Sequence, residues 1–289
     1  MPRRNVAMKS SAAAGVQVIA VSGGKGGVGK TTVAINLATA LAQAGRKVLL
    51  LDADLGLASV DVLLGLTPTA TLEQVLADER PLEEILLTTA DGVTVIPSAS
   101  GVARMAQLPT TESAAIVRAF STLPGDYDTM IVDTAPGIGD SVLFFCQASQ
   151  HHLIVIRDEP ASLTDAYALI KILRRGYQVR RFRVLVNMSS AGADPKELFD
   201  RLRGVTDRFL DVMLEFAGEI PDDDAVPRAV RAQRPVLSIA PSGRAARAFQ
   251  RLASKVMAWT PIDAPSGGVS FFFERLVTRP TARIPKVVK

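Results

Sequence analysis

A glycine-rich loop between an apolar run and a helical pattern constrains this fold more than any other feature of the sequence. The apolar run covers residues 16–21, and the loop after it reads Ser-Gly-Gly-Lys-Gly-Gly-Val-Gly-Lys-Thr-Thr over residues 22–32. Apolar residues then recur at helical spacing from Val33 to Leu41, and the pattern ends at Gly45. A strand, a glycine loop and a helix in this order form a cradle for phosphate, because the glycines let backbone N–H groups turn toward an anion at the positive end of the helix.

The side chains of this loop suit a nucleotide with its metal ion. Lys30 is long enough to reach the β- and γ-phosphates, and the hydroxyl of Thr31 is a ligand for Mg²⁺. A glycine-rich turn without a ligand is the alternative, but the flanking strand and helix argue against it. The predicted nucleotide-binding residues of the loop are Gly24, Lys25, Gly26, Gly27, Val28, Gly29, Lys30, Thr31 and Thr32.

Apolar, β-branched runs recur along the rest of the chain, with helical patterns between them. Continuous apolar runs are typical of strands buried on both faces, and their alternation with helices predicts an α/β fold with a doubly wound, mostly parallel sheet flanked by helices. The predicted strands cover residues 16–21, 47–51, 93–96, 129–132, 153–156, 183–187 and 215–220. Helices are predicted over residues 112–121, 162–174, 195–210 and 242–258.

Acidic residues follow two of these strands at their carboxyl ends, where open α/β sheets bind their ligands. Asp52 and Asp54 end the second strand, and Asp133 ends the fourth. A buried strand that carries a carboxylate at its tip can present it to Mg²⁺, so Asp133 is the best candidate ligand. For the first two aspartates, capping of a following helix is the alternative.

A polar residue at the end of the sixth strand indicates which base is bound. The amide of Asn187 both donates and accepts hydrogen bonds, which fits the N6/N1 edge of adenine. The Asn-Lys-x-Asp loop that recognises guanine is absent. The sequence therefore predicts ATP, with Mg²⁺, as the nucleotide.

Lys25 is a second lysine inside the loop, and phosphate cradling by one subunit does not require it. With this residue the motif Lys-Gly-Gly-Val-Gly-Lys-Thr-Thr resembles the deviant Walker A motif of the MinD/ParA-type P-loop ATPases. The resemblance implies that Lys25 reaches the nucleotide of a second subunit, so that ATP binding produces a homodimer.

The same resemblance assigns roles to other residues. Asp54 is expected to orient the attacking water, so that Asp54, Lys25 and Lys30 form the predicted catalytic set, while Asp52 supports the Mg²⁺ shell beside Thr31 and Asp133. Gly137 is placed like the switch glycine that senses the γ-phosphate. The sequence Ile-Pro-Asp-Asp at residues 220–223 resembles the base-and-ribose loop, which assigns nucleotide contacts to Pro221 and Asp223.

Four further blocks resemble the FleN/FlhG branch of this family, at residues 51–66, 137–142, 158–171 and 205–211. This branch restrains flagellar number and placement through slow ATP hydrolysis. The resemblance implies an antiactivator that binds a flagellar master transcription activator, and it suggests a signal-recognition-type flagellar GTPase as a further partner. Some members stimulate that GTPase through a short Asp-Gln-containing motif, which residues 1–15 lack.

The end of the chain predicts a membrane-binding helix. Apolar residues at Val269, Phe272, Phe273 and Leu276 recur at helical spacing beside arginines, which suits an interfacial helix on an anionic membrane. Docking of this helix on the protein itself is the alternative. The predicted organisation is a flexible segment 1–15, an ATPase domain 16–260, a linker 261–268 and an amphipathic helix with a basic tail 269–289.

Composition bears on location and on the rival functions. The chain has one cysteine, Cys146, in an apolar run, which favours a reduced cytoplasmic protein and argues against an iron–sulfur carrier. We expect a cytoplasmic location, with membrane association at the cell pole in the ATP state. A MinD-type division regulator and a ParA-type partition ATPase remain alternatives. The second would bind DNA through the arginines at positions 174, 175, 180, 181 and 183, but we interpret these as a solvated face and do not expect direct DNA binding.

Overall fold

The computed structural model describes residues 16–98, 115–120, 123 and 126–260. In this part of the chain the sheet has eight strands in the order β3-β4-β2-β5-β1-β6-β7-β8. All neighbouring strands are parallel except β3 and β4. The strands are β1 (Gln17–Ser22), β2 (Val48–Ala53), β3 (Leu87–Thr88), β4 (Val93–Ile96), β5 (Thr129–Thr134), β6 (His151–Ile156), β7 (Arg181–Ser189) and β8 (Met213–Pro221).

The seven predicted strands are all present, with each end placed to within two residues, and the short strand β3 is an eighth that the sequence did not predict. The helices are α1 (Lys30–Gln43), α2 (Val60–Leu63), α3 (Leu72–Leu76), the 3₁₀ turn η1 (Leu82–Ile85), α6 (Asp140–Gln147), α7 (Pro160–Tyr177), α8 (Pro195–Phe209), α9 (Ala225–Arg231), α10 (Val236–Ile239) and α11 (Arg244–Met257). Of the helix predicted over residues 112–121, residues 115–120 are described, and they are helical.

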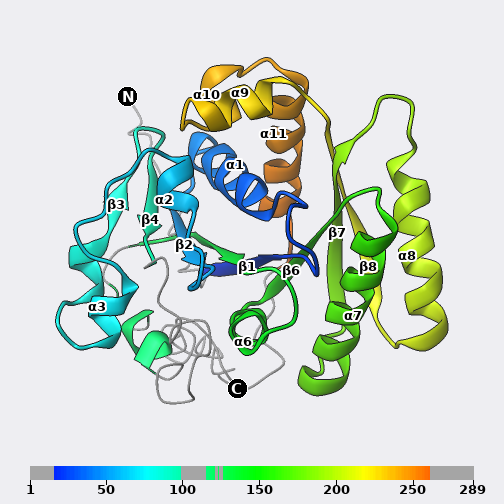
Figure 1. Ribbon diagram of the computed structural model, residues 1–289, viewed down its shortest axis with the longest axis horizontal. Coiled ribbons are helices and arrows are strands. Elements are labelled where there is room, and N and C mark those ends of the chain that lie inside the picture. Colours follow the sequence, from blue (N-terminus) through cyan, green and yellow to red (C-terminus); the bar gives the residue numbers. More distant parts are fainter. Residues whose placement is uncertain (1–15, 99–114, 121–122, 124–125, 261–289) are drawn as a thin grey trace, which may run out of the picture.

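Helices cover both faces of the sheet (Figure 1). On one face α1, α9, α10 and α11 share an apolar core with the inward side chains of the strands. On the other face α6, α7 and α8 pack over the half of the sheet that ends at β8, while α3 and η1 pack over the other half. This layered arrangement confirms the predicted doubly wound sheet.

The strand register brings the predicted acidic residues together. Asp133 of β5 lies opposite Val21 of β1 on one side and opposite Asp52 of β2 on the other. The glycine-rich loop connects β1 to α1, so it begins at this same carboxyl edge of the sheet. The register therefore places the loop and the two aspartates at one site.

Arg183 corrects the prediction of a solvated arginine face. The residue is only 3% exposed, and its guanidinium lies 4.1 Å from the centre of the Trp259 ring. Nη1 lies 3.0 Å from Nδ1 of His151, and Nε lies 3.1 Å from a carboxylate oxygen of Glu215. Composition suggested a shared exposed cluster, but a position inside β7 turns this side chain into the protein.

Three predicted segments lie outside the described residues. They are the N-terminal segment 1–15, the linker 261–268 and the tail 269–289, which includes Phe272, Phe273 and Leu276. Among the helices that the structure describes, none has the length and apolar character needed to cross a membrane.

Candidate nucleotide-binding site

The loop between β1 and α1 has a backbone that requires glycine at particular positions. Gly29 caps the start of α1 with a φ of 86°, a left-handed conformation that side chains rarely adopt. Gly24 packs so tightly against the backbone of Asp165 in α7 that a Cβ atom would collide with it. The motif is therefore fixed both by the turn and by the helix beside it.

Lys30 is a buried cation at the start of α1. It is 7% exposed, and its Nζ donates a hydrogen bond to the backbone oxygen of Lys25 at 3.3 Å. Burial lowers the pKa of Lys30, and the charges of Asp133 and Asp54 oppose that shift. Within the described residues Lys30 forms no ion pair at contact distance, so its charge remains available to a phosphate.

Asp133 is the most deeply buried acid of the site. It is fully buried, and neither carboxylate oxygen has a hydrogen-bond partner among the residues that the structure describes. Burial raises its pKa well above the ordinary value and the charge of Asp52 adds to this, while the neighbouring Thr31 hydroxyl and Lys30 act in the opposite direction.

A buried carboxylate without a hydrogen-bond partner is the kind of oxygen ligand that a hard cation such as Mg²⁺ prefers. The proximity of Thr31 adds the hydroxyl that was predicted as a second ligand. The residues present at this site therefore fit Mg²⁺, which would be held by Asp133 and Thr31.

Asp52 performs the role that sequence reasoning gave as the alternative. One of its oxygens accepts the backbone N–H groups of Ser59 at 2.8 Å and Val60 at 2.9 Å, at the start of α2. The other accepts the N–H of Asp54 at 3.1 Å. Burial raises the pKa of Asp52 to about 6 in spite of these bonds. Asp52 thus shapes the turn that carries Asp54, and its support of the Mg²⁺ shell stays a prediction.

Asp54 is half-buried at the start of the same turn. Its side chain accepts the N–H of Leu57 at 3.2 Å, and its charge is close enough to act on Lys30 and Asp133. This places Asp54 at the predicted site with a carboxylate that is only partly engaged. Its action on a water molecule stays a prediction.

Two residues from other strand ends contact the loop directly. The N–H of Gly137 donates to the backbone oxygen of Gly23 at 3.4 Å, and Gly137 has a φ of 92°. The Nδ2 of Asn187 donates to the backbone oxygen of Val28 at 2.8 Å. Both residues therefore hold the loop in place. The predicted contacts of Gly137 with the γ-phosphate and of Asn187 with adenine are not tested by these bonds.

The loop after β8 has a structural role that the sequence did not indicate. One oxygen of Asp223 accepts the N–H of Ala225 at 2.9 Å, and the other accepts the N–H of Ala245 at 3.0 Å. These two bonds lower the pKa of Asp223 and join the starts of α9 and α11. Pro221 is the last residue of β8, opposite Ser189. Contacts of Pro221 and Asp223 with the base or ribose remain predictions.

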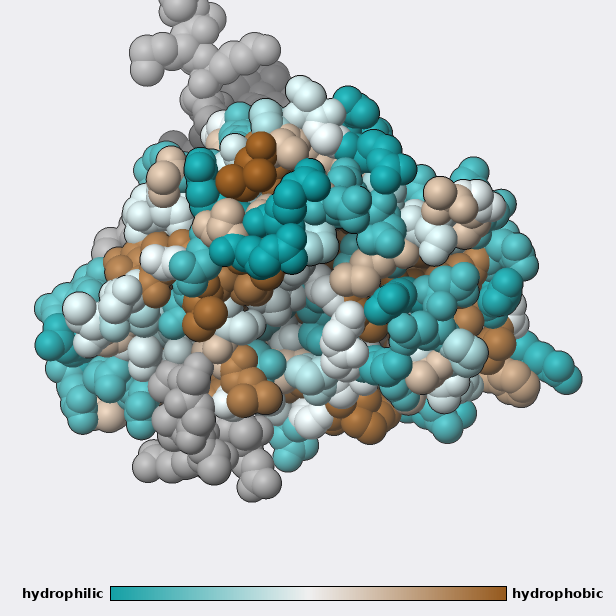
Figure 2. Space-filling model, turned by 45° about the horizontal axis from the view of Figure 1, so that its top comes forward, coloured by the Kyte–Doolittle hydropathy of each residue, from teal (hydrophilic) through white to brown (hydrophobic). Residues whose placement is uncertain are grey.

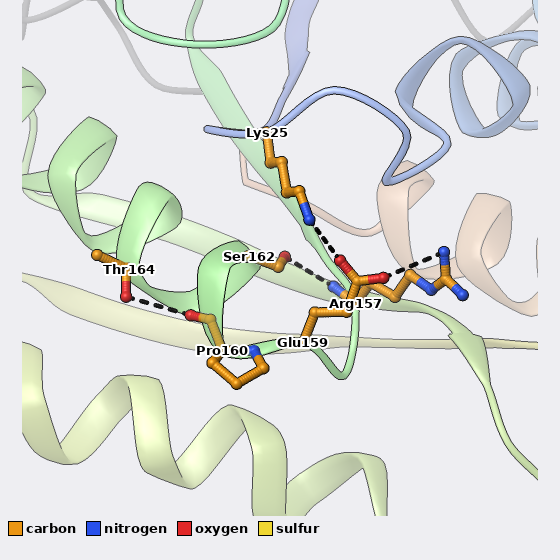
Figure 3. A network of polar contacts seen from close by, with 6 residues as sticks. All are labelled: Lys25, Arg157, Glu159, Pro160, Ser162 and Thr164. Carbon is orange, nitrogen blue, oxygen red and sulfur yellow. Dashed lines mark hydrogen bonds and ion pairs between the residues drawn. The ribbon is translucent and has the colours of Figure 1, made fainter.

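Lys25 is held by its own subunit, in a network that sequence reasoning missed. Its Nζ lies 2.7 Å from one oxygen of Glu159, and Arg157 lies 3.3 Å from the other oxygen (Figure 3). The backbone N–H of Arg157 is fixed by the Ser162 hydroxyl at 3.0 Å. The hydrogen bond from Lys25 is the main cause of the lowered pKa of Glu159. The pair is partly exposed, so it is weak enough to open.

Similarity to known proteins assigns the chain to a family. The family model of ParA, described as a NUBPL iron-transfer P-loop NTPase, matches residues 15–257. The chain belongs to the ParA/MinD family of P-loop ATPases. It is 52% identical to Antiactivator FleN of Pseudomonas aeruginosa over 265 residues. The aligned region covers 92% of this chain and 95% of the relative.

More distant members of the ParA/MinD family agree with this placement. Flagellum site-determining protein YlxH of Helicobacter pylori is 30% identical, over 90% of this chain and 89% of the relative. The septum site-determining protein MinD of Pyrococcus horikoshii, solved with Mg-ADP, superposes with a TM-score of 0.69 at 26% identity, over 84% of this chain and 96% of that structure. Like other ParA/MinD proteins, this chain is an ATPase that uses ATP and Mg²⁺.

The description of the family model names iron transfer, but this chain lacks the several cysteines that an iron–sulfur cluster requires. Cys146 is the one cysteine of the sequence, and it is fully buried in α6. Burial raises the pKa of its thiol to about 11, so the thiolate that a metal requires is disfavoured. This buried environment fits a packing role for Cys146.

Proposed function

We propose that this ATPase is a nucleotide-driven switch that restrains flagellar number and placement, as an antiactivator of a flagellar master transcription activator. The observation that carries the proposal is the 52% identity to Antiactivator FleN across nearly the full length of both chains. The flagellum site-determining relative supports the same process. MinD relatives support a division-site or partition ATPase only as members of the wider family.

In the proposed switch, ATP brings two copies of the chain face to face. In the structure of the single chain, Glu159 neutralises Lys25. When the two copies meet, Lys25 leaves Glu159 and binds the triphosphate of the other copy. The buried positive charge of Lys30 holds the phosphates within its own subunit. The exchange is favourable because a triphosphate carries more negative charge than one partly exposed carboxylate.

Hydrolysis then reopens the dimer. Asp54 orients the attacking water, because its carboxylate lies at the site and is only partly engaged by the backbone. Asp133 and Thr31 would hold Mg²⁺, which would supply positive charge to the phosphates. Asp52 keeps the turn in place through its three backbone bonds. Catalysis by these residues is positioning and charge stabilisation.

The location and the remaining partners belong to the same proposal. The ATPase acts in the cytoplasm and reaches an anionic membrane at the cell pole in the ATP state. The proposed contact is the apolar stripe of Phe272, Phe273 and Leu276 in the tail, beside its arginines. A signal-recognition-type flagellar GTPase is a second proposed partner.

A pull-down with three forms of the full chain tests the proposed function. Asp54→Ala with ATP is the closed form, Lys30→Ala is the form without nucleotide, and the wild type with ADP is the open form. We expect the flagellar transcription activator in the first sample and its depletion from the other two, identified by mass spectrometry. Recovery of division-site or partition proteins in its place would contradict the proposal.

A further inference from the structure

The outer edge of β8 is an open end of the sheet. β8 is the last strand in the sheet order and pairs only with β7 among the described residues. It lies between α8 on one face of the sheet and α11 on the other (Figure 1). An unpaired strand edge presents backbone donors and acceptors to which another chain can add.

A groove follows this edge, with a volume of about 460 Å³. Its floor is apolar and includes Phe216, Ala217 and Leu252. Its rim carries Lys196 from the start of α8, and Arg251 and Lys255 from α11. A groove of this size accepts several side chains, and its walls offer apolar contact below and positive charge above. We call it the β8 groove.

The stretch of chain that contributes α11 to the β8 groove is strongly basic. Residues 225–258 contain no acidic residue, and their basic residues are all exposed: Arg228, Arg231, Arg234, Arg244, Arg247, Arg251 and Lys255. Strongly hydrophilic residues gather over this side of the molecule where α9, α10 and α11 come forward (Figure 2). Arg251 and Lys196 form no ion pair with a residue that the structure describes.

The acidic residues of the groove are already engaged. Asp194 accepts the backbone N–H of Lys196 at 2.8 Å as the cap of α8. Glu219 accepts the hydroxyl of Ser189 at 2.8 Å. Both carboxylates keep their charge, but the three cations of the rim (Lys196, Arg251 and Lys255) outnumber the two acids, so the lining of the groove has a formal net charge of +1.

One backbone acceptor of the edge is occupied by a side chain that can leave. The pairing of β8 with β7 skips Ala217, where a bulge precedes Gly218. The oxygen of Ala217 accepts a hydrogen bond from Nζ of Lys255 at 2.8 Å. A lysine on a strand edge discourages indiscriminate pairing. An incoming carboxylate would attract Lys255 and free this oxygen for a backbone N–H.

We propose that the β8 groove binds an extended acidic segment of a partner protein, which lies along β8 as an additional strand. Acidic side chains of the segment meet Lys196 on the side of α8, and Arg251 and Lys255 on the side of α11, while its apolar side chains meet the floor. A second copy of this chain would bring the same cations to the same edge and be repelled. Duplex DNA offers no apolar side chains to the floor.

Fluorescence anisotropy with two labelled ten-residue peptides tests the proposal on the full chain. One peptide repeats Glu-Glu-Val-Val, which puts acidic and apolar side chains on both faces of an added strand, and the other has Lys in place of every Glu. We expect the acidic peptide to bind and the basic peptide not to bind. In the variant Lys196→Glu/Arg251→Glu the Kd of the acidic peptide should rise at least tenfold.

A matched variant separates the groove from general charge. Arg231→Glu/Arg234→Glu changes the net charge by the same amount within the acid-free stretch but outside the groove, and its Kd should stay within about threefold of the wild type. Bound acidic peptide should slow amide hydrogen exchange in residues 213–221. ATP binding, measured in parallel, should be unchanged in both variants.

Four results would overturn the proposal. The first is no preference for the acidic peptide over the basic one, and the second is an equal loss of affinity in the two charge-reversed variants. The third is unchanged exchange in residues 213–221. The fourth is binding of a labelled duplex, in place of the acidic peptide, that depends on Lys196 and Arg251.

Discussion

At the scale of residues, the site joins features that the sequence indicates and contacts that it does not. The loop lysines and Asp133 follow from the motif and the strand ends, and the structure places Lys30, Asp54 and Asp133 within electrostatic reach of one another. Glu159 lies 134 positions from Lys25, so no local pattern relates them. The only signal was its place before Pro160, in a block that resembles the flagellar branch.

Release of Lys25 is a testable property of a single residue. Glu159→Gln removes the ion pair that holds Lys25 in its own subunit, so dimers should form at a severalfold lower ATP concentration, as measured by light scattering. Glu197→Gln is the matched control, because it removes a comparable surface ion pair, with Arg201 at 2.8 Å, away from the site. A higher ATP requirement for Glu159→Gln than for the control would contradict the holding role.

Asp133 gives a prediction that separates metal binding from stability. Asp133→Asn removes a buried carboxylate that has no hydrogen-bond partner within the described part of the chain, so without nucleotide the variant should melt at the same temperature as the wild type or higher. The rise in melting temperature that Mg-ATP gives the wild type should disappear. A variant that keeps this rise would show that Asp133 does not hold Mg²⁺.

At the scale of elements, the strands were predictable because their apolar runs are long and continuous. The short elements were not: β3 has two residues and α2 has four, which is too few for a period to show. The caps were also missed in part, since Asp223 reaches Ala245 across 22 positions. Arg183 was misplaced because a count of arginines ignores position along the strand: Arg181 begins β7 and is exposed, whereas Arg183, two residues further on the same face, is buried.

The start of β6 predicts how stability depends on pH. Burial, with the charge of Arg183 as a smaller cause, lowers the pKa of His152 to about 4 from an ordinary 6.5. Well above pH 6.5 the His152 side chain is neutral in both the folded and the unfolded chain. As the pH falls from 6.5 to 4 the unfolded chain takes up the proton first, so His152 costs roughly 1.4 kcal/mol of stability per pH unit.

The variant His152→Leu isolates this contribution. Asp52, whose pKa is raised to about 6, increasingly stabilises the fold as the pH falls. Because Asp52 is present in both proteins, the informative quantity is the difference between their free energies of unfolding. Between pH 7.5 and 4.5 the free energy of unfolding should shift in favour of the variant by about 2.5 kcal/mol, as measured by urea denaturation. A difference that is independent of pH would show that His152 is not held neutral in the fold.

At the scale of the whole molecule, the nucleotide site and the β8 groove lie on different parts of the fold. The nucleotide site lies at the carboxyl edge of β1, β2 and β5, and the β8 groove lies at the end of the sheet beyond β7. The sequence predicts the first because its motif is local. The groove depends on which strand ends the sheet and on how α8 and α11 flank it, so only the structure reveals it.

Hydrolysis and association should separate in two variants of the whole protein. Asp54→Ala should bind ATP and remain a dimer, because its nucleotide is not turned over. Lys25→Ala should bind ATP and remain a monomer, because Lys30 still holds the phosphates but no charge reaches the second subunit. Phosphate release should be lost in both.

Light scattering on the Asp54→Ala variant, with and without saturating ATP, decides whether ATP joins two copies of the chain. We expect a mass near the 30.7 kDa of one chain without nucleotide and twice that mass with ATP. A mass that stays at one chain while calorimetry records ATP binding would contradict this expectation.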